Sequence, residues 1–99
     1  MSAYVISPDA LNDLQDIWDF IAADNVRAAD KLQDEFFEAF DELARRPGVG
    51  HTRHDLTKRE VRFWPLGSYL IVYREIPDRI QIVAIFHGAR DIPTEIAGR

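Results

Sequence analysis

Cysteine is absent from the 99-residue sequence, so disulfide bonds and thiolate metal sites are excluded. The absence fits a reducing compartment, and we expect the protein in the cytoplasm. Long apolar runs are also missing, and no stretch reaches the length that a transmembrane helix needs. Residues 1–9 lack the basic start and the apolar run of a secretory signal. We therefore expect neither a membrane partner nor export.

Positive charge is scarce, because 12 Lys and Arg stand against 17 Asp and Glu, a formal net charge of −5. This balance argues against a general nucleic-acid binder, and we expect no direct, specific contact with nucleic acid. Residues 1–44 hold two basic and eleven acidic residues, whereas residues 45–62 hold six basic and two acidic residues. An acidic body therefore carries one basic segment. Its six basic residues are Arg45, Arg46, Arg53, Lys58, Arg59 and Arg62.

The length predicts a single domain over residues 1–99. Hydrophobic residues make up 46% of the chain, which is enough for one core in a domain of this size. Neither an internal repeat nor a low-complexity linker divides the sequence. We treat the whole chain as one folding unit.

Two stretches with apolar residues every three or four positions predict amphipathic helices. Ser7 before a proline predicts the capped start of the first helix, and Trp18 is predicted as one of its core residues. Asn25 predicts the start of the second helix, and Pro47 predicts its end. Two adjacent helices with a short joint predict an antiparallel hairpin.

The hydrophobic period then changes to two, which is typical of strands. The last strand is predicted to be central in its sheet, because it is apolar on both faces. The remaining tail is polar and predicted to be partly helical. Strands are predicted at residues 3–6, 61–64, 69–76 and 79–87, with a turn at 65–68. In the last strand one face is predicted to hold Ile80, Ile82, Ala84 and Phe86, and the other Val83 and Ile85.

The order of elements is β-α-α-β-β-β, which predicts an α+β domain with a helical hairpin packed on a small, mainly antiparallel sheet. This order and several local sequences resemble the RelE/ParE toxin superfamily, in particular its ParE-like branch. The matching segments occur in the same order as in the superfamily, over nearly the whole chain. They are residues 4–14, 43–50, 61–63, 69–73 and 83–91.

The resemblance implies the toxin of a type II toxin–antitoxin system, neutralised by a cognate, ParD-like antitoxin that wraps around it as a hetero-oligomer. Two activities are implied by the two branches of the superfamily. ParE-like members inhibit DNA gyrase, whereas RelE-like members cut messenger RNA in the ribosome. A degenerate member that only binds an antitoxin is a third alternative. None of these alternatives implies a cofactor.

RNA cleavage requires a base, an acid and cations around the phosphate, for which the candidates are Arg62, His87 and Arg90. Two departures weaken this alternative. Leu70 stands where RelE-like sequences usually have arginine, and no tyrosine follows the last strand. An acidic body is also repelled by RNA phosphates. The sequence therefore favours the ParE-like alternative, and we name no catalytic residue for it.

The basic segment together with Trp64 is our predicted antitoxin-binding surface. We expect an exposed sheet edge next to it to take up part of an acidic, amphipathic antitoxin tail. His51, His54 and Asp55 have a spacing that suits a metal pair. Without further ligands we interpret them as a solvated loop and predict no metal site.

Overall fold

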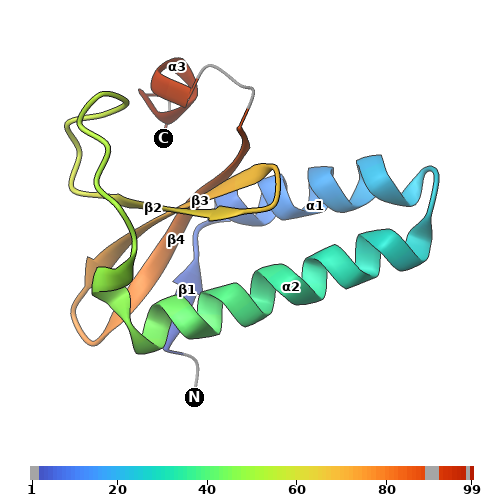
Figure 1. The fold of residues 1–99 in the computed structure, drawn as a ribbon, viewed down its shortest axis with the longest axis horizontal. Helices are drawn as coiled ribbons and strands as arrows, with labels where there is room; N and C mark the ends of the chain where they lie inside the picture. The colour runs from blue at the N-terminus through green and yellow to red at the C-terminus, as the bar shows by residue number, and fades with distance from the viewer. Residues whose placement is uncertain (1–2, 89–91, 98) are drawn as a thin grey trace.

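The computed structural model describes residues 3–88, 92–97 and 99, and it has the predicted order of elements (Figure 1). The fold class, a helical hairpin on a mainly antiparallel sheet, is confirmed. No helix in these described residues is long and apolar enough to cross a bilayer. The helices are α1 (Pro8–Ala22), α2 (Val26–Arg45) and α3 (Ile92–Ala97), with a single 3-10 turn η1 (Pro47–Val49). The strands are β1 (Tyr4–Ile6), β2 (Arg62–Leu66), β3 (Tyr69–Ile76) and β4 (Arg79–His87).

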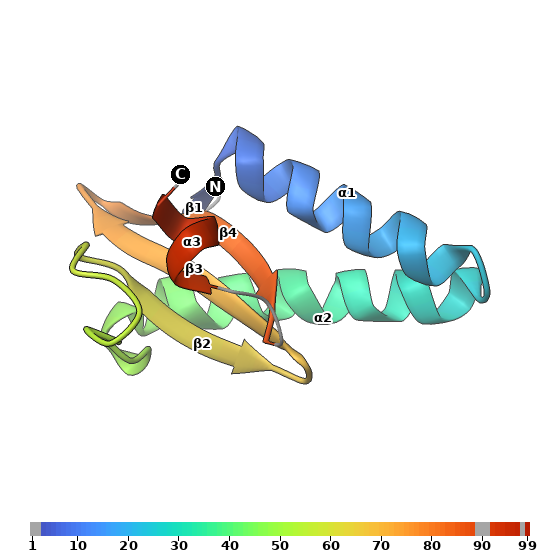
Figure 2. The ribbon, with the colours of Figure 1, turned by 90° about the horizontal axis from the view of Figure 1, so that it is seen from above.

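The four strands form one sheet in the order β1-β4-β3-β2. β1 runs parallel to β4, whereas β2, β3 and β4 form an antiparallel meander. β4 is therefore internal, as its apolar residues on both faces predict. The hairpin of α1 and α2 covers one side of the sheet and extends beyond it, while α3 lies on the other side (Figures 1 and 2).

The helix starts follow from local capping. The Ser7 hydroxyl accepts a hydrogen bond from the Ala10 amide at 3.1 Å, and the Asn25 side chain accepts one from the Ala28 amide at 3.0 Å. Both predicted caps are confirmed. Trp18, however, is only partly buried, and its indole donates to the Asp30 carboxylate at 2.9 Å. Its prediction as a core residue was wrong.

Two apolar cores lie on opposite faces of the sheet. The hairpin core packs the helices on the sheet and includes Phe36, Phe40, Leu43, Ile71 and Tyr73. The second core joins the other face to α3 and to the end of the 50–61 loop, and it includes Val61, Phe63, Phe86, Ile92 and Ile96. The tail is partly helical as predicted, but it is anchored by two buried isoleucines rather than being uniformly polar.

A β-bulge divides β4 between these cores. Val72 pairs with Ala84, whereas the next residue, Tyr73, pairs with Ile82, so Val83 is the extra residue. Ile80 and Ile82 face the hairpin core, but Ala84 and Phe86 belong to the second core. The prediction that these four residues share one face was wrong, because a one-residue insertion reverses the direction of every later side chain.

The predicted turn at residues 65–68 is shorter than expected. Pro65 and Leu66 belong to β2, opposite Leu70 and Tyr69. Only two residues form the turn, and one of them is Gly67 at φ +57°. Proline is tolerated in β2 because this strand is at the edge of the sheet.

Candidate partner-binding surface

The basic side chains of residues 45–62 do not form one continuous surface. Arg45 and Arg46 lie at the end of α2, where Val49 still packs on the hairpin core. The 50–61 loop then crosses to the other face of the sheet, where Leu56 and Val61 pack in the second core. Figure 1 shows this loop in yellow-green, reaching towards α3. The structure therefore divides the basic side chains between the two faces.

Three of the six basic side chains are already paired with neighbouring acids. Arg45 and Arg46 contact the Glu42 carboxylate at 2.6 and 2.8 Å, and Arg53 contacts Asp55 at 2.7 Å. The hydrogen bond from Arg45 and the charge of Arg46 lower the pKa of Glu42. All these groups are largely in water, where such pairs are weak. A partner's carboxylates can compete for them, but only by replacing an existing contact.

Lys58 and Arg59 carry the uncommitted charge of the segment. Both are exposed, and neither forms an ion pair with any residue of 3–88, 92–97 or 99. Arg59 lines a shallow pocket together with Arg74 and Arg99. Asp9 and Glu60 line the same pocket, and Arg99 is paired with Asp13, so the positive charge that can attract an acidic partner here comes from Arg59 and Arg74.

Arg62 belongs to an internal clamp at the end of α2. Its guanidinium donates to the Gly50 carbonyl at 3.1 Å. The fully buried Tyr73 hydroxyl accepts from the Gly50 amide at 2.8 Å and donates to the Pro47 carbonyl at 2.7 Å. Burial raises the pKa of Tyr73, so the hydroxyl keeps the proton that it donates. The clamp fixes the chain after α2 against the sheet.

Trp64 is the aromatic member of the predicted surface. It is half-buried and packs against the hairpin core. Its indole stacks on the His51 ring with centroids 6.3 Å apart and an interplanar angle of 13°. Much of its apolar surface is therefore used within the chain, and the part that a partner can reach is small.

The sheet edge next to the basic segment is closed. His51 and Phe63 exchange two backbone hydrogen bonds of 2.9 and 2.7 Å along the outer side of β2. The backbone nitrogen of Pro65 faces the same outer side of β2 as that of Phe63, but proline has no amide hydrogen to donate. The expectation of an exposed edge at this place was wrong, because the loop folds back and pairs with the strand.

The opposite edge of the sheet, at β1, is open. Ala3 and Ser7 bond to β4, so the intervening Tyr4 and Ile6 direct their amides and carbonyls away from it. Neither residue has a backbone hydrogen bond to any other described residue. Two donors and two acceptors are therefore available to an added strand, on a stretch of only three residues.

Arg62 and His87, the two residues of the RNase alternative that the structure describes, are not brought together. Arg62 pairs with Tyr73 across β2 and β3, whereas His87 pairs with Tyr69 across β3 and β4. Tyr69 and Tyr73 are separated by roughly 13 Å along the strand. Arg90 lies outside the described residues. Arg62 is held at Gly50, so it does not share a phosphate-sized space with His87.

A family model described as "ParE toxin of type II toxin-antitoxin system, parDE" matches residues 4–92. The chain belongs to the ParE toxin family. The fold agrees with a solved structure described as "Chromosomal ParDE TA system from P. aeruginosa". The two chains are 22% identical, with a TM-score of 0.72 over 88% of this chain and 96% of the other. A search of curated proteins gave no match.

Membership of the ParE family makes the chain the toxin of a type II toxin–antitoxin system and implies a cognate antitoxin as its partner. The predicted ParE-like branch is thus confirmed. The loop with His51, His54 and Asp55 has other roles in this ParE chain. His51 stacks on Trp64, and Asp55 bonds to Arg53. The described part of the chain contains no group of three potential metal ligands.

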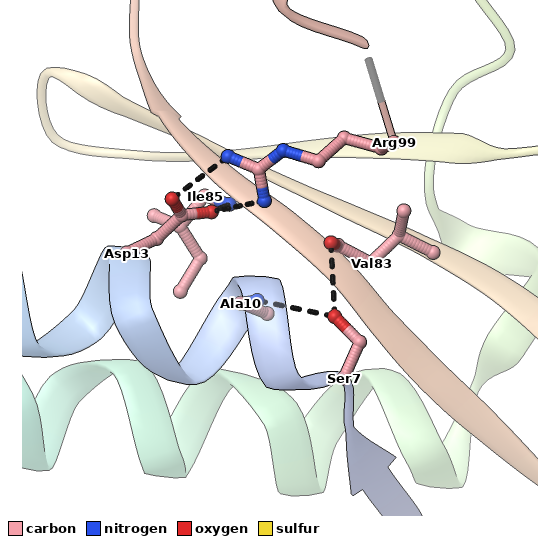
Figure 3. A network of polar contacts seen from close by, with 6 residues as sticks. All are labelled: Ser7, Ala10, Asp13, Val83, Ile85 and Arg99. Carbon is pink, nitrogen blue, oxygen red and sulfur yellow. Dashed lines mark hydrogen bonds and ion pairs between the residues drawn. The ribbon is translucent and has the colours of Figure 1, made fainter. Parts of the chain in front are cut away.

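Sequence reasoning missed one polar network, which joins α1 of the ParE fold to β4 and to the chain end (Figure 3). Asp13 receives two hydrogen bonds from the Arg99 guanidinium, at 2.8 and 2.9 Å, and one from the Ile85 amide at 2.9 Å. The bond to Asp13 raises the pKa of Arg99, which also lies 5.2 Å from the centre of the Phe86 ring. The partners are 86 residues apart, so no local pattern predicts them.

Proposed function

We propose that a ParD-like antitoxin holds this chain inactive and that the free chain inhibits DNA gyrase. Both partners are cytoplasmic proteins, and the antitoxin complex is a hetero-oligomer. The observation that carries the choice of gyrase over messenger RNA is the separation of Arg62 from His87 across the sheet. General acid and phosphate-binding groups act only when they reach the same reacting phosphate. Together with the acidic body, this arrangement supports a protein target.

Induction of the chain in cells tests the target. We expect growth arrest with DNA-damage signalling, while primer extension finds intact transcripts. His87→Ala is expected to leave the arrest unchanged, because inhibition of gyrase does not require a general acid at the end of β4. Codon-positioned cuts that disappear in His87→Ala would instead support the RNase. Absence of growth arrest would support the degenerate, antitoxin-binding alternative.

The antitoxin is proposed to contact the part of the basic segment that lies on the α3 side of the sheet. Arg62 is unsuitable for a test, because its loss also removes the contact with Gly50. Lys58 and Arg59 are exposed and carry no such role. If the antitoxin also adds a strand, the open β1 edge is the place for it, since the His51 bridge occupies β2.

Charge reversal at Lys58 and Arg59, to Glu at both positions, is expected to weaken antitoxin binding by roughly tenfold and to flatten its salt dependence. Titration calorimetry at two salt concentrations measures both effects. Reversal of Arg27 and Lys31 on exposed positions of α2 makes the same change in net charge and is the matched control. Equal losses in the two double variants would show that only total charge matters.

A further inference from the structure

A groove runs between α1 and the ends of β3 and β4. Its volume is about 510 Å³, within the range of ~300–1,000 Å³ that is typical of ligand sites. Apolar surface from Ile17, Phe20, Tyr69 and Ile85 lines it. We call it the α1 groove. Neither the basic segment nor the clamp at Gly50 contributes to it.

One residue of the apolar wall of the α1 groove, Phe20, is unusually exposed. Phe20 has 80% of its surface in water, although Ile85 beside the groove is buried. Helical spacing places Phe20 on the same flank of α1 as Asp13, Asp16 and Ile17. A phenyl ring next to a concave apolar surface is typical of a position that becomes buried by a partner.

The charge at the groove indicates which partner fits. Asp13 is already neutralised by Arg99, which also lines the groove. Asp16 is exposed and makes no hydrogen bond or ion pair with any described residue. Residues 1–44 carry eleven acidic and two basic residues. Two copies of α1 therefore repel each other, whereas a basic side chain is attracted to Asp16.

We infer that the α1 groove binds an apolar segment of the antitoxin in which a lysine or arginine pairs with Asp16. The inference rests on the proposed antitoxin complex and adds a second surface to it. This surface has the opposite charge from Lys58 and Arg59. An antitoxin that occupies both surfaces needs acidic residues in one part of its tail and an apolar, basic part elsewhere. Binding at both surfaces then fixes how the antitoxin is aligned along the toxin, in addition to raising its affinity.

Phe20→Asp is the direct test, measured as the affinity of the full chain for its full-length antitoxin. We expect a loss of roughly 30-fold or more, as for a buried aromatic anchor. Asp16→Lys is expected to weaken binding by roughly fivefold through charge alone. Leu11→Asp is the matched control, because Leu11 is 52% exposed on the other flank of α1. This control is expected to change affinity by less than about threefold.

The outcomes separate this inference from the proposed function. Full affinity in Phe20→Asp, with weakened binding in the Lys58 and Arg59 reversal, would overturn the α1 groove and leave the proposed complex intact. Absence of antitoxin binding by the unaltered chain would overturn both. Sedimentation of the free chain adds a third readout. A dimer that dissociates on Phe20→Asp would show that the groove binds a second copy, which also overturns the inference.

Discussion

Asp13→Ala is expected to lower the free energy of unfolding by about 2–3 kcal/mol. The carboxylate accepts from both nitrogens of Arg99 and from the Ile85 amide, and both charged side chains are only 16% exposed. Alanine would leave a largely desolvated guanidinium and a backbone amide without this acceptor. Because both side chains keep some contact with water, this loss in free energy of unfolding is smaller than that of breaking a fully buried pair, about 3–5 kcal/mol. Urea denaturation followed by circular dichroism measures it.

Two variants make this prediction specific. Arg99→Leu is expected to cost less than Asp13→Ala, because Asp13 keeps its bond to the Ile85 amide and some access to water. Asp16→Ala, one turn away on an exposed position, is expected to change stability by less than about 0.5 kcal/mol. Equal effects of Asp13→Ala and Asp16→Ala would show that the network contributes nothing to folding.

Gly50→Ala is expected to destabilise the fold by about 2 kcal/mol. A methyl group there would lie 2.7 Å from the Tyr73 ring carbon Cε1 and closer still to the hydroxyl. Tyr73 is fully buried in the hairpin core, so the ring has no free space to move into. Either the ring or the turn must shift, and the bonds to Gly50 and Pro47 are then strained or lost.

Gly48 provides the matched control for this effect, since it lies in the same turn two residues earlier. A methyl group at Gly48 meets no atom within 4 Å, and we expect Gly48→Ala to change the free energy of unfolding by less than about 0.5 kcal/mol. Thermal unfolding of both variants beside the unaltered chain measures the difference. Similar values for the two substitutions would show that the contact with Tyr73 is unimportant.

The helices were predictable because their signals are local. Ser7 and Asn25 cap the two helix starts, and α2 ends just before Pro47. Each signal involves residues within one helical turn, so neighbouring sequence alone determines it. The antiparallel meander followed from the change of apolar period and from short turns. These parts of the fold depend little on distant residues.

The errors arose where distant residues decide the structure. The bulge at Val83 is invisible in the sequence, because apolar residues fill both faces of β4 and either register buries them. His51 closes the β2 edge from twelve residues away. Pro65 was taken for a turn residue, yet an edge strand tolerates it.

The candidate site was harder to predict than the fold. The basic residues lie in one segment of the sequence, residues 45–62, but the loop after Gly50 places Lys58 and Arg59 on the other face of the sheet. The α1 groove requires the packing of α1 beside β4. Helical spacing places the exposed Phe20 beside the acidic residues of α1, but that spacing does not show a groove next to it. Composition identified the charge polarity of the chain, whereas the geometry came only from the fold.

The pairing of β1 with β4 also has a consequence for synthesis. Tyr4 lies opposite Ile80, so β1 gains its neighbour in the sheet only after β4 has been synthesised. Until then the hairpin core that contains Phe36 and Phe40 of α2 also lacks Ile80 and Ile82. Contacts between such distant residues form late in folding. A translation product that stops before β4 therefore lacks the native sheet, and any harm that this toxin does requires β4 to have been synthesised.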